Sequence, residues 1–292
     1  MQTSELLAKV RKIEIQTKHI VDEITGGAYH SVFKGRGLEF SEVREYTPGD
    51  DVRDIDWNVT ARMGQPFIKK YAEERELNVM LAVDISSSTL FGSSAKENKR
   101  SLMIQSAALL ALSAIRNNDK VGLFLFSDQT ELLLSPRSGR THTLRLIREL
   151  LASESSCGRT DLGIALETLA SFLKKKTVIF LISDFMDGKD YEKQLRLLAR
   201  KHDLIAMRIL DPAEKILPCE IRGMTLEDLE SGETLFFTGS REQYALGAEQ
   251  QSAAAAEICR KANVDMIEIC SGEDPVKALM TFFRKRRSGK RK

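Results

Sequence analysis

Cysteine is scarce in this sequence and is not clustered. The 292 residues contain four cysteines, Cys157, Cys219, Cys259 and Cys270, and no C-x-x-C pair. This spacing argues against a disulfide framework and against a zinc site built from thiolates, and it suits a reducing compartment. We therefore expect a cytoplasmic protein without structural disulfides.

Long hydrophobic runs are also missing. The longest apolar stretch, residues 107–115, is far shorter than the roughly 20 residues that a membrane-spanning helix needs. The first twenty residues carry scattered charges and lack the continuous apolar core of a secretory signal. The sequence therefore predicts neither a membrane segment nor a signal peptide.

The common catalytic motifs are absent too. The chain has no G-x-S-x-G nucleophile elbow and no G-x-x-x-x-G-K-[ST] phosphate-binding loop. Its four histidines, His19, His30, His142 and His202, show no metal-ligand spacing. These absences disfavour serine hydrolases, nucleotide-binding enzymes and histidine-based metal sites.

Charge is balanced along the chain except at its end. Lysine and arginine total 44, against 42 acidic residues, and seven of the basic residues lie within Arg284–Lys292. A basic terminus attracts phosphate without sequence preference, but a solvated disordered tail has the same composition. Because no aromatic residues interleave with these charges, we predict a disordered tail over 287–292 and no specific nucleic-acid partner.

From residue 75 to 286, short apolar runs alternate with amphipathic helical patterns. The expected strands are residues 78–84, 120–127, 177–183, 204–210 and 264–269, and the expected helices are 98–117, 141–151, 161–174, 191–201, 242–262 and 275–286. Near-continuous apolar strands that alternate with helices predict an α/β domain with a doubly wound, mostly parallel sheet. Two segments depart from this alternation: residues 129–136 predict an antiparallel edge strand, and 220–239 predict a β-hairpin around Ser231-Gly232.

Residues 1–74 have a different pattern. Apolar residues spaced by three and four from Leu6 to Ile24 predict a helix, which either packs on its own domain or forms a seam for a partner. Residues 28–74 then predict a β-rich segment. Alternation of Ile55, Trp57 and Val59 indicates a strand, on which Trp57 is expected to be buried.

Oxygen-bearing side chains follow three of the predicted elements at what should be one edge of the sheet. Asp84, Ser86 and Ser88 form a D-x-S-x-S loop after the first strand, Thr160 precedes the helix that opens at Asp161, and Asp184 ends the strand 177–183. Ligands bind at this edge in doubly wound sheets. Two carboxylates and three hydroxyls are hard donors that suit Mg²⁺. Taken singly, each piece is better explained by a structural role, such as a helix N-cap at Thr160. The three together predict a metal site.

The region from about residue 77 to 286 resembles a von Willebrand factor A domain. Asp84, Ser86, Ser88, Thr160 and Asp184 match the five-residue metal-ion-dependent adhesion site (MIDAS) of those domains without departure. The resemblance implies that the serines and threonine coordinate the ion directly or nearly so. It also implies that the aspartates act directly or through water, and that a partner's glutamate or aspartate completes the coordination sphere.

A second resemblance covers the segment before this domain. It rests on the pattern Gly37-x-Glu39-Phe40-x-x-x-Arg44-x-Tyr46-x-x-Gly49-Asp50-x-x-Arg53-x-Ile55-Asp56-Trp57. The pattern is similar to a signature in an uncharacterised prokaryotic family with a von Willebrand factor A-like domain. That family is associated with MoxR-type AAA+ ATPases, so the resemblance implies such an ATPase as a partner.

The residues of this signature allow two interpretations. Arginines alternate with carboxylates, and arginine forks pair well with carboxylates in partly buried sites. The block is then either an ion-pair network that fastens the segment to its neighbour or a docking surface for the ATPase. On the second interpretation the candidate partner-binding residues are Arg44, Asp50, Arg53, Asp56 and Trp57.

The sequence as a whole therefore predicts an adaptor rather than an enzyme. We expect it to bind Mg²⁺ or Mn²⁺ and to recognise a carboxylate on a partner protein. The alternative is a Mg²⁺-dependent hydrolase or phosphotransferase that uses the same site. A phosphatase with an aspartate nucleophile would need D-x-D at the end of the first strand, where this chain has Ser86.

Overall fold

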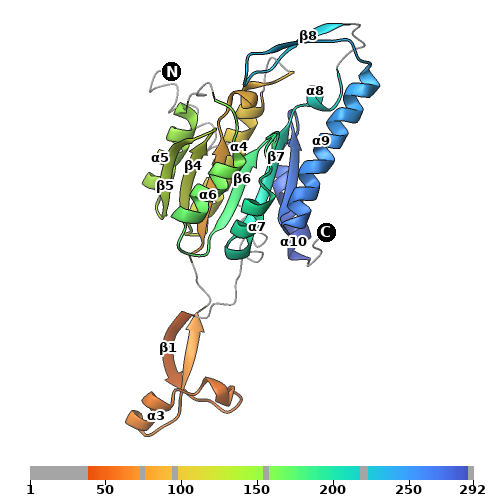
Figure 1. The fold of residues 1–292 in the computed structure, drawn as a ribbon. Helices are drawn as coiled ribbons and strands as arrows, with labels where there is room; N and C mark the ends of the chain where they lie inside the picture. The colour runs from red at the N-terminus through yellow and green to blue at the C-terminus, as the bar shows by residue number, and fades with distance from the viewer. Residues whose placement is uncertain (1–38, 73–75, 94–97, 154–157, 218–222, 289–292) are drawn as a thin grey trace. The chain divides into compact units, whose positions relative to one another are not determined.

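The described part of the chain divides into two units, which Figure 1 draws with their helices and strands labelled. The structure is a computed structural model that describes residues 39–72, 76–93, 98–153, 158–217 and 223–288. The smaller unit lies within Phe33–Glu76, and the larger one includes Leu77–Lys292. The helix expected between Leu6 and Ile24 lies outside the described residues, as does the end of the basic tail.

The apolar runs of the larger unit form a six-stranded sheet. Its strands are β3 (Asn78–Asp84), β4 (Lys120–Phe126), β5 (Thr130–Arg137), β6 (Val178–Ser183), β7 (Asp203–Leu210) and β10 (Asp265–Cys270). Their order is β10-β7-β6-β3-β4-β5, and every pair is parallel except β4 with β5. The predicted fold class, an α/β domain with a doubly wound, mostly parallel sheet, is confirmed.

Helices cover both faces of this sheet (Figure 1). On one face lie α4 (Lys99–Arg116), α5 (Arg140–Ala152) and α10 (Pro275–Arg287); on the other lie α6 (Leu162–Phe172), α7 (Glu192–Lys201) and α9 (Arg241–Lys261). Side chains of β3 alternate between the two layers, so that Met80 and Ala82 join the core under α6, α7 and α9. Within the described residues, no helix is both long enough and apolar enough to cross a membrane.

Both predicted departures from the helix–strand alternation are confirmed. β5 is the antiparallel strand at the edge of the sheet. β8 (Met224–Glu227) and β9 (Thr234–Phe237) pair as an antiparallel hairpin, whose turn contains Gly232 with a φ of +71°. A short helix, α8 (Pro212–Lys215), follows β7.

The smaller unit differs from the prediction around Trp57. β1 (Glu39–Glu45) and β2 (Phe67–Ala72) form an antiparallel pair, joined through a 3-10 turn (Val52–Asp54) and helix α3 (Trp57–Met63). The strand expected at Ile55–Val59 is wrong, because Asp56 accepts hydrogen bonds from the first helical amides and Gly64 (φ +72°) ends the helix. The expected burial of Trp57 is also wrong: its side chain is 67% exposed.

Candidate metal centre

The candidate site lies where the strand order of the sheet reverses. β3 lies between β4 and β6 in the sheet. The chain moves from β3 to β4 toward one edge of the sheet, and from β6 to β7 toward the other edge. Loops that leave adjacent strands in opposite directions open a crevice at the carboxyl edge. Asp84 ends β3 and Asp184 directly follows β6, so the topology brings the two predicted carboxylates to this edge of the sheet.

The loop after β3 is folded around the carboxylate of Asp84. Its Oδ1 accepts a hydrogen bond from the Ser86 amide at 2.9 Å, and its Oδ2 accepts one from the Ser183 hydroxyl at 2.7 Å. The hydroxyls of Ser86 and Ser88 lie 3.0 Å apart. Asp84 and Ser86 are completely buried, and Ser88 is partly exposed. The loop thus presents one carboxylate and two hydroxyls together.

The carboxylate of Asp184 pairs with a buried lysine. Its Oδ1 accepts from the Met186 amide at 3.1 Å, and its Oδ2 lies 2.7 Å from Lys99 Nζ. The same ammonium lies 2.6 Å from Glu214 Oε1. Burial alone would lower the pKa of Lys99, but Asp184 and Glu214 outweigh it and raise the pKa above its ordinary value. Lys99 therefore stays charged inside the protein.

The third loop places Thr160 against the first. The Ser87 amide donates to the Gly158 carbonyl at 3.3 Å, which joins the two loops. Asp161, not Thr160, is the N-cap of α6, because its side chain accepts from the Ile164 amide at 2.9 Å. The alternative role of Thr160 as a helix cap is therefore wrong. Its hydroxyl, 6% exposed with its residue, instead donates to Glu230 Oε1 at 2.9 Å.

These contacts bring the predicted site residues to one rim of the sheet, and their chemistry fits a hard divalent cation. Burial and the nearby carboxylate of Asp184 raise the pKa of Asp84 well above its ordinary value. A cation bound by both carboxylates would relieve the repulsion between them. Across the described ranges, no three His, Cys, Asp or Glu side chains are grouped so as to hold a metal. A cation here would therefore depend on the hydroxyls as well as the two aspartates.

The other candidate block, in the smaller unit, is not a single network. Arg44 and Asp50 form a two-pronged pair at 2.7 and 2.8 Å, and these bonds hold the pKa of Asp50 well below its usual range. Asp56 caps α3. Arg53 and Trp57 are exposed. The structure thus gives the carboxylates local structural roles and leaves an arginine and a tryptophan on the surface.

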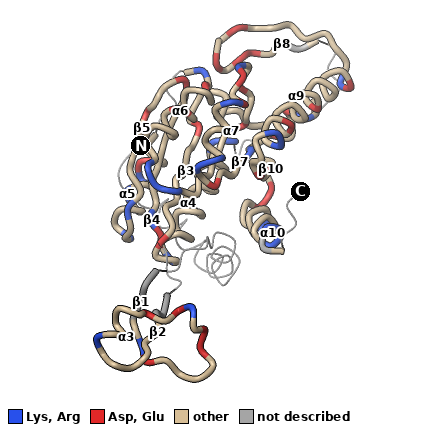
Figure 2. The backbone as a smooth tube through the Cα atoms, turned by 60° about the horizontal axis from the view of Figure 1, so that its bottom comes forward, with Lys and Arg blue, Asp and Glu red and all other residues tan. Residues whose placement is uncertain are grey.

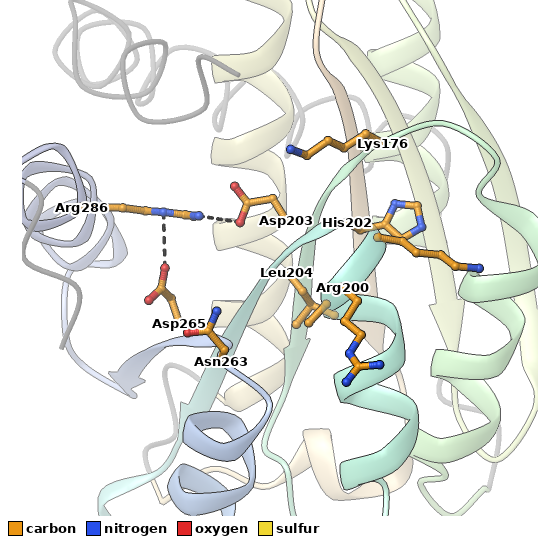
Figure 3. A pocket seen from close by; sticks show the side chains of 10 residues that line it. Lys176, Arg200, His202, Asp203, Leu204, Asn263, Asp265 and Arg286 are labelled. Carbon is orange, nitrogen blue, oxygen red and sulfur yellow. Dashed lines mark hydrogen bonds and ion pairs between the residues drawn. The ribbon is translucent and has the colours of Figure 1, made fainter. Parts of the chain in front are cut away.

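A second polar hollow lies at the opposite edge of the sheet, where β7 and β10 begin. It has a volume of about 220 Å³, and Figure 3 shows Arg286 between Asp203 and Asp265 on its wall. His202 also lines it and is 6% exposed; burial, with Lys201 beside it, lowers the pKa of His202. This hollow shares no residue with the candidate metal centre.

Four side chains of the rim were not predicted as part of the site: Lys99, Ser183, Glu214 and Glu230. Lys99 had a signal, since a lysine in the first turn of a helix opposes the helix dipole and needs a partner elsewhere. Glu214 belongs to a recognisable capping box with Asp211, but this motif does not predict the ion pair of Glu214 with Lys99. No local pattern connects Glu230 with Thr160, seventy residues away.

Comparison with solved structures gives likenesses that concern the fold alone. BatB from Bacteroides thetaiotaomicron is 14% identical with a TM-score of 0.47, and the alignment covers 73% of this chain and 99% of that one. The SpRpn10 VWA domain is 13% identical with a TM-score of 0.43, covering 71% and 95%. Proximal thread matrix protein 1 from the mussel byssus, with a zinc-occupied MIDAS motif, is 19% identical with a TM-score of 0.36, covering 47% and 38%.

Similarity to other sequences extends over nearly the whole chain. An uncharacterized protein of Mycobacterium tuberculosis is 29% identical over 290 residues, which is 98% of this chain and 91% of the relative. A protein of Mycobacterium bovis matches to the same extent. The family described as "Protein of unknown function DUF58" matches residues 42–256, a range that includes all five predicted metal ligands and most of both units. The chain belongs to this family.

Proposed function

We propose that this protein binds a divalent cation at Asp84, Ser86, Ser88, Thr160 and Asp184 and uses it to hold a carboxylate of a partner protein. The ion is Mg²⁺ or Mn²⁺, because every donor is an oxygen. The observation that carries the proposal is the pair of buried aspartates at the strand-order reversal, with three hydroxyls beside them. When bound, the ion supplies positive charge that attracts an acidic side chain.

The partner we propose is a MoxR-type AAA+ ATPase, working with this chain in protein assembly or maturation. Support comes from the signature between Gly37 and Trp57. The smaller unit also exposes Val52, Trp57 and Met63, at 58%, 67% and 64%, and exposed aromatic and apolar side chains are common at protein interfaces. We place a second contact with the ATPase on this surface.

Metal titration tests the site directly. Calorimetry of chelator-treated protein is expected to show one Mg²⁺ per chain, with a Kd on the order of micromolar to millimolar because few charged ligands are supplied. Asp84→Asn keeps the shape of the side chain but removes its charge, so uptake should be lost. Because the pKa of Asp84 is raised in the metal-free protein, protons compete with the ion, and affinity should rise from mildly acidic to neutral pH.

The matched control is Asp128→Asn. Asp128 follows β4 at the same edge of the sheet and is exposed, but it is not one of the proposed ligands. This variant should take up metal as the wild type does. Equal uptake by wild type and Asp84→Asn would show that the site is assigned to the wrong residues.

Catalysis is not expected at this site. Of the histidines that the structure describes, His142 contacts the Val121 carbonyl and His202 lies at the opposite edge, so no imidazole stands beside the hydroxyls to activate one. Assays with nucleoside triphosphates and a generic phosphoester should give background rates in Mg²⁺. Metal-dependent turnover that disappears in Asp84→Asn would favour the hydrolase or phosphotransferase instead.

A further inference from the structure

The hydroxyl of Thr160 contacts a carboxylate from a distant part of the chain. Asp161 already caps α6, so Thr160 is free of that role, and it donates to Glu230 Oε1 at 2.9 Å. Glu230 lies in the turn between β8 and β9. In Figure 1 this hairpin extends from the beginning of α9 across the edge of the sheet at which β3 and β6 end.

The turn is built so that Glu230 points toward the rim. Asp228 accepts hydrogen bonds from the Glu230 amide at 2.9 Å and from the Ser231 hydroxyl at 2.7 Å, and its carbonyl accepts from the Gly232 amide at 2.7 Å. Acidic residues recur along the hairpin, which carries several red segments in Figure 2. Glu230 is partly buried, whereas Glu227 and Glu233 are exposed. One carboxylate of the hairpin is therefore directed inward.

A carboxylate in this position has the chemistry of a metal ligand. A threonine hydroxyl can donate its proton to a carboxylate while its lone pairs remain available to an ion. Glu230 brings a negative charge to Thr160, one of the five proposed ligands. A divalent cation held by Thr160 would attract this carboxylate.

We infer that Glu230 is an internal carboxylate ligand of the metal centre and takes the position that a partner's carboxylate would occupy. The inference rests on the proposed function, because it requires the cation. Metal binding then fixes the β8–β9 hairpin on the rim, and an incoming acidic side chain must displace Glu230. The strength of the contact between Glu230 and the ion thereby determines how tightly a partner carboxylate must bind in order to replace it.

The test compares Glu230→Gln with Glu227→Gln, which removes an exposed carboxylate from the same hairpin. Titration with Mn²⁺ should show a Kd raised on the order of tenfold in Glu230→Gln. Water-proton relaxation should show an additional exchangeable water on the bound Mn²⁺. Hydrogen exchange of residues 224–237 should slow on addition of Mn²⁺ in wild type and in Glu227→Gln, but not in Glu230→Gln.

The outcomes separate this inference from the proposed function. If wild type takes up Mn²⁺, Asp84→Asn does not, and Glu230→Gln matches Glu227→Gln in affinity, relaxation and exchange, then the metal centre stands and Glu230 is not its ligand. If wild type takes up no Mn²⁺, the proposed function fails and this inference fails with it. A weakened affinity with an added water and a released hairpin supports the inference, because a purely structural role would not change the hydration of the ion.

Discussion

Replacing Lys99 with methionine is expected to lower the free energy of unfolding by about 3–5 kcal/mol. The Lys99 side chain is 1% exposed and lies between Asp184, also 1% exposed, and Glu214, which is 12% exposed. Methionine fills a similar volume but leaves both carboxylates buried without their counter-ion. Chemical denaturation of metal-free protein, followed by circular dichroism, measures the change.

Two comparisons make this result specific. Lys193→Met on α7 removes an exposed lysine and should change stability by no more than about 0.5 kcal/mol. Adding Glu214→Gln to Lys99→Met should recover part of the loss, since one stranded carboxylate becomes neutral. Millimolar Mg²⁺ should recover part of it as well, because the ion would compensate Asp184. A Lys99→Met protein as stable as Lys193→Met would mean that the buried triad contributes no stability.

The sheet could be predicted because each buried strand is recognisable from its own short stretch of sequence. β6 is buried at every position from Val178 to Ser183, and a strand buried on both faces reads as an unbroken apolar run. Once strands and helices alternate, parallel pairing places the carboxyl ends of β3 and β6 at one edge. The placement of Asp84, Ser86 and Asp184 at one rim therefore required no knowledge of long-range contacts.

The segment around Trp57 could not be assigned from alternation alone. Ile55, Trp57 and Val59 alternate as in a strand, but Asp56 and Gly64 are also the start and stop signals of a short helix. Strand-like alternation and helix-capping residues overlap in this segment, and the structure follows the capping residues. The capping pattern was readable in the sequence, so this error came from giving periodicity more weight than caps.

The partners of the site residues were beyond prediction for a different reason. Lys99 pairs with Asp184, 85 residues away, and with Glu214, 115 residues away. Glu230 meets Thr160 only because a hairpin turns back over the rim. Such contacts are set by how packed elements bring distant side chains together, and no periodic pattern records them. The sequence could therefore predict candidate ligands but not the charges that surround them.

Chelation of the metal is expected to weaken the proposed complex with a MoxR-type ATPase by about 2–5 kcal/mol if the contact is a buried charge pair. With the ion in place, a partner carboxylate gains Coulombic attraction in a partly desolvated rim. Without it, the same carboxylate meets Asp84 and Asp184 and is repelled. Surface plasmon resonance in Mg²⁺ and then in EDTA measures the difference. Ser86→Ala and Thr160→Ala should weaken binding less than Asp84→Asn, because each removes a neutral ligand.

The same measurement with Trp57→Ala separates the two surfaces that could carry the ATPase. Trp57 is exposed on the smaller unit, so its removal should leave metal uptake unchanged and should not alter the ratio of affinities in Mg²⁺ and EDTA. If both buffers give equal affinity for wild type and Trp57→Ala lowers it in each, the ATPase binds the smaller unit without using the metal rim. A different result would place the metal-dependent contact at the carboxyl edge of the sheet: the ratio of affinities in Mg²⁺ and EDTA falls to one in Asp84→Asn but is unchanged in Trp57→Ala. The proposed ion lies at that edge, and its presence determines whether a partner carboxylate there is attracted or repelled.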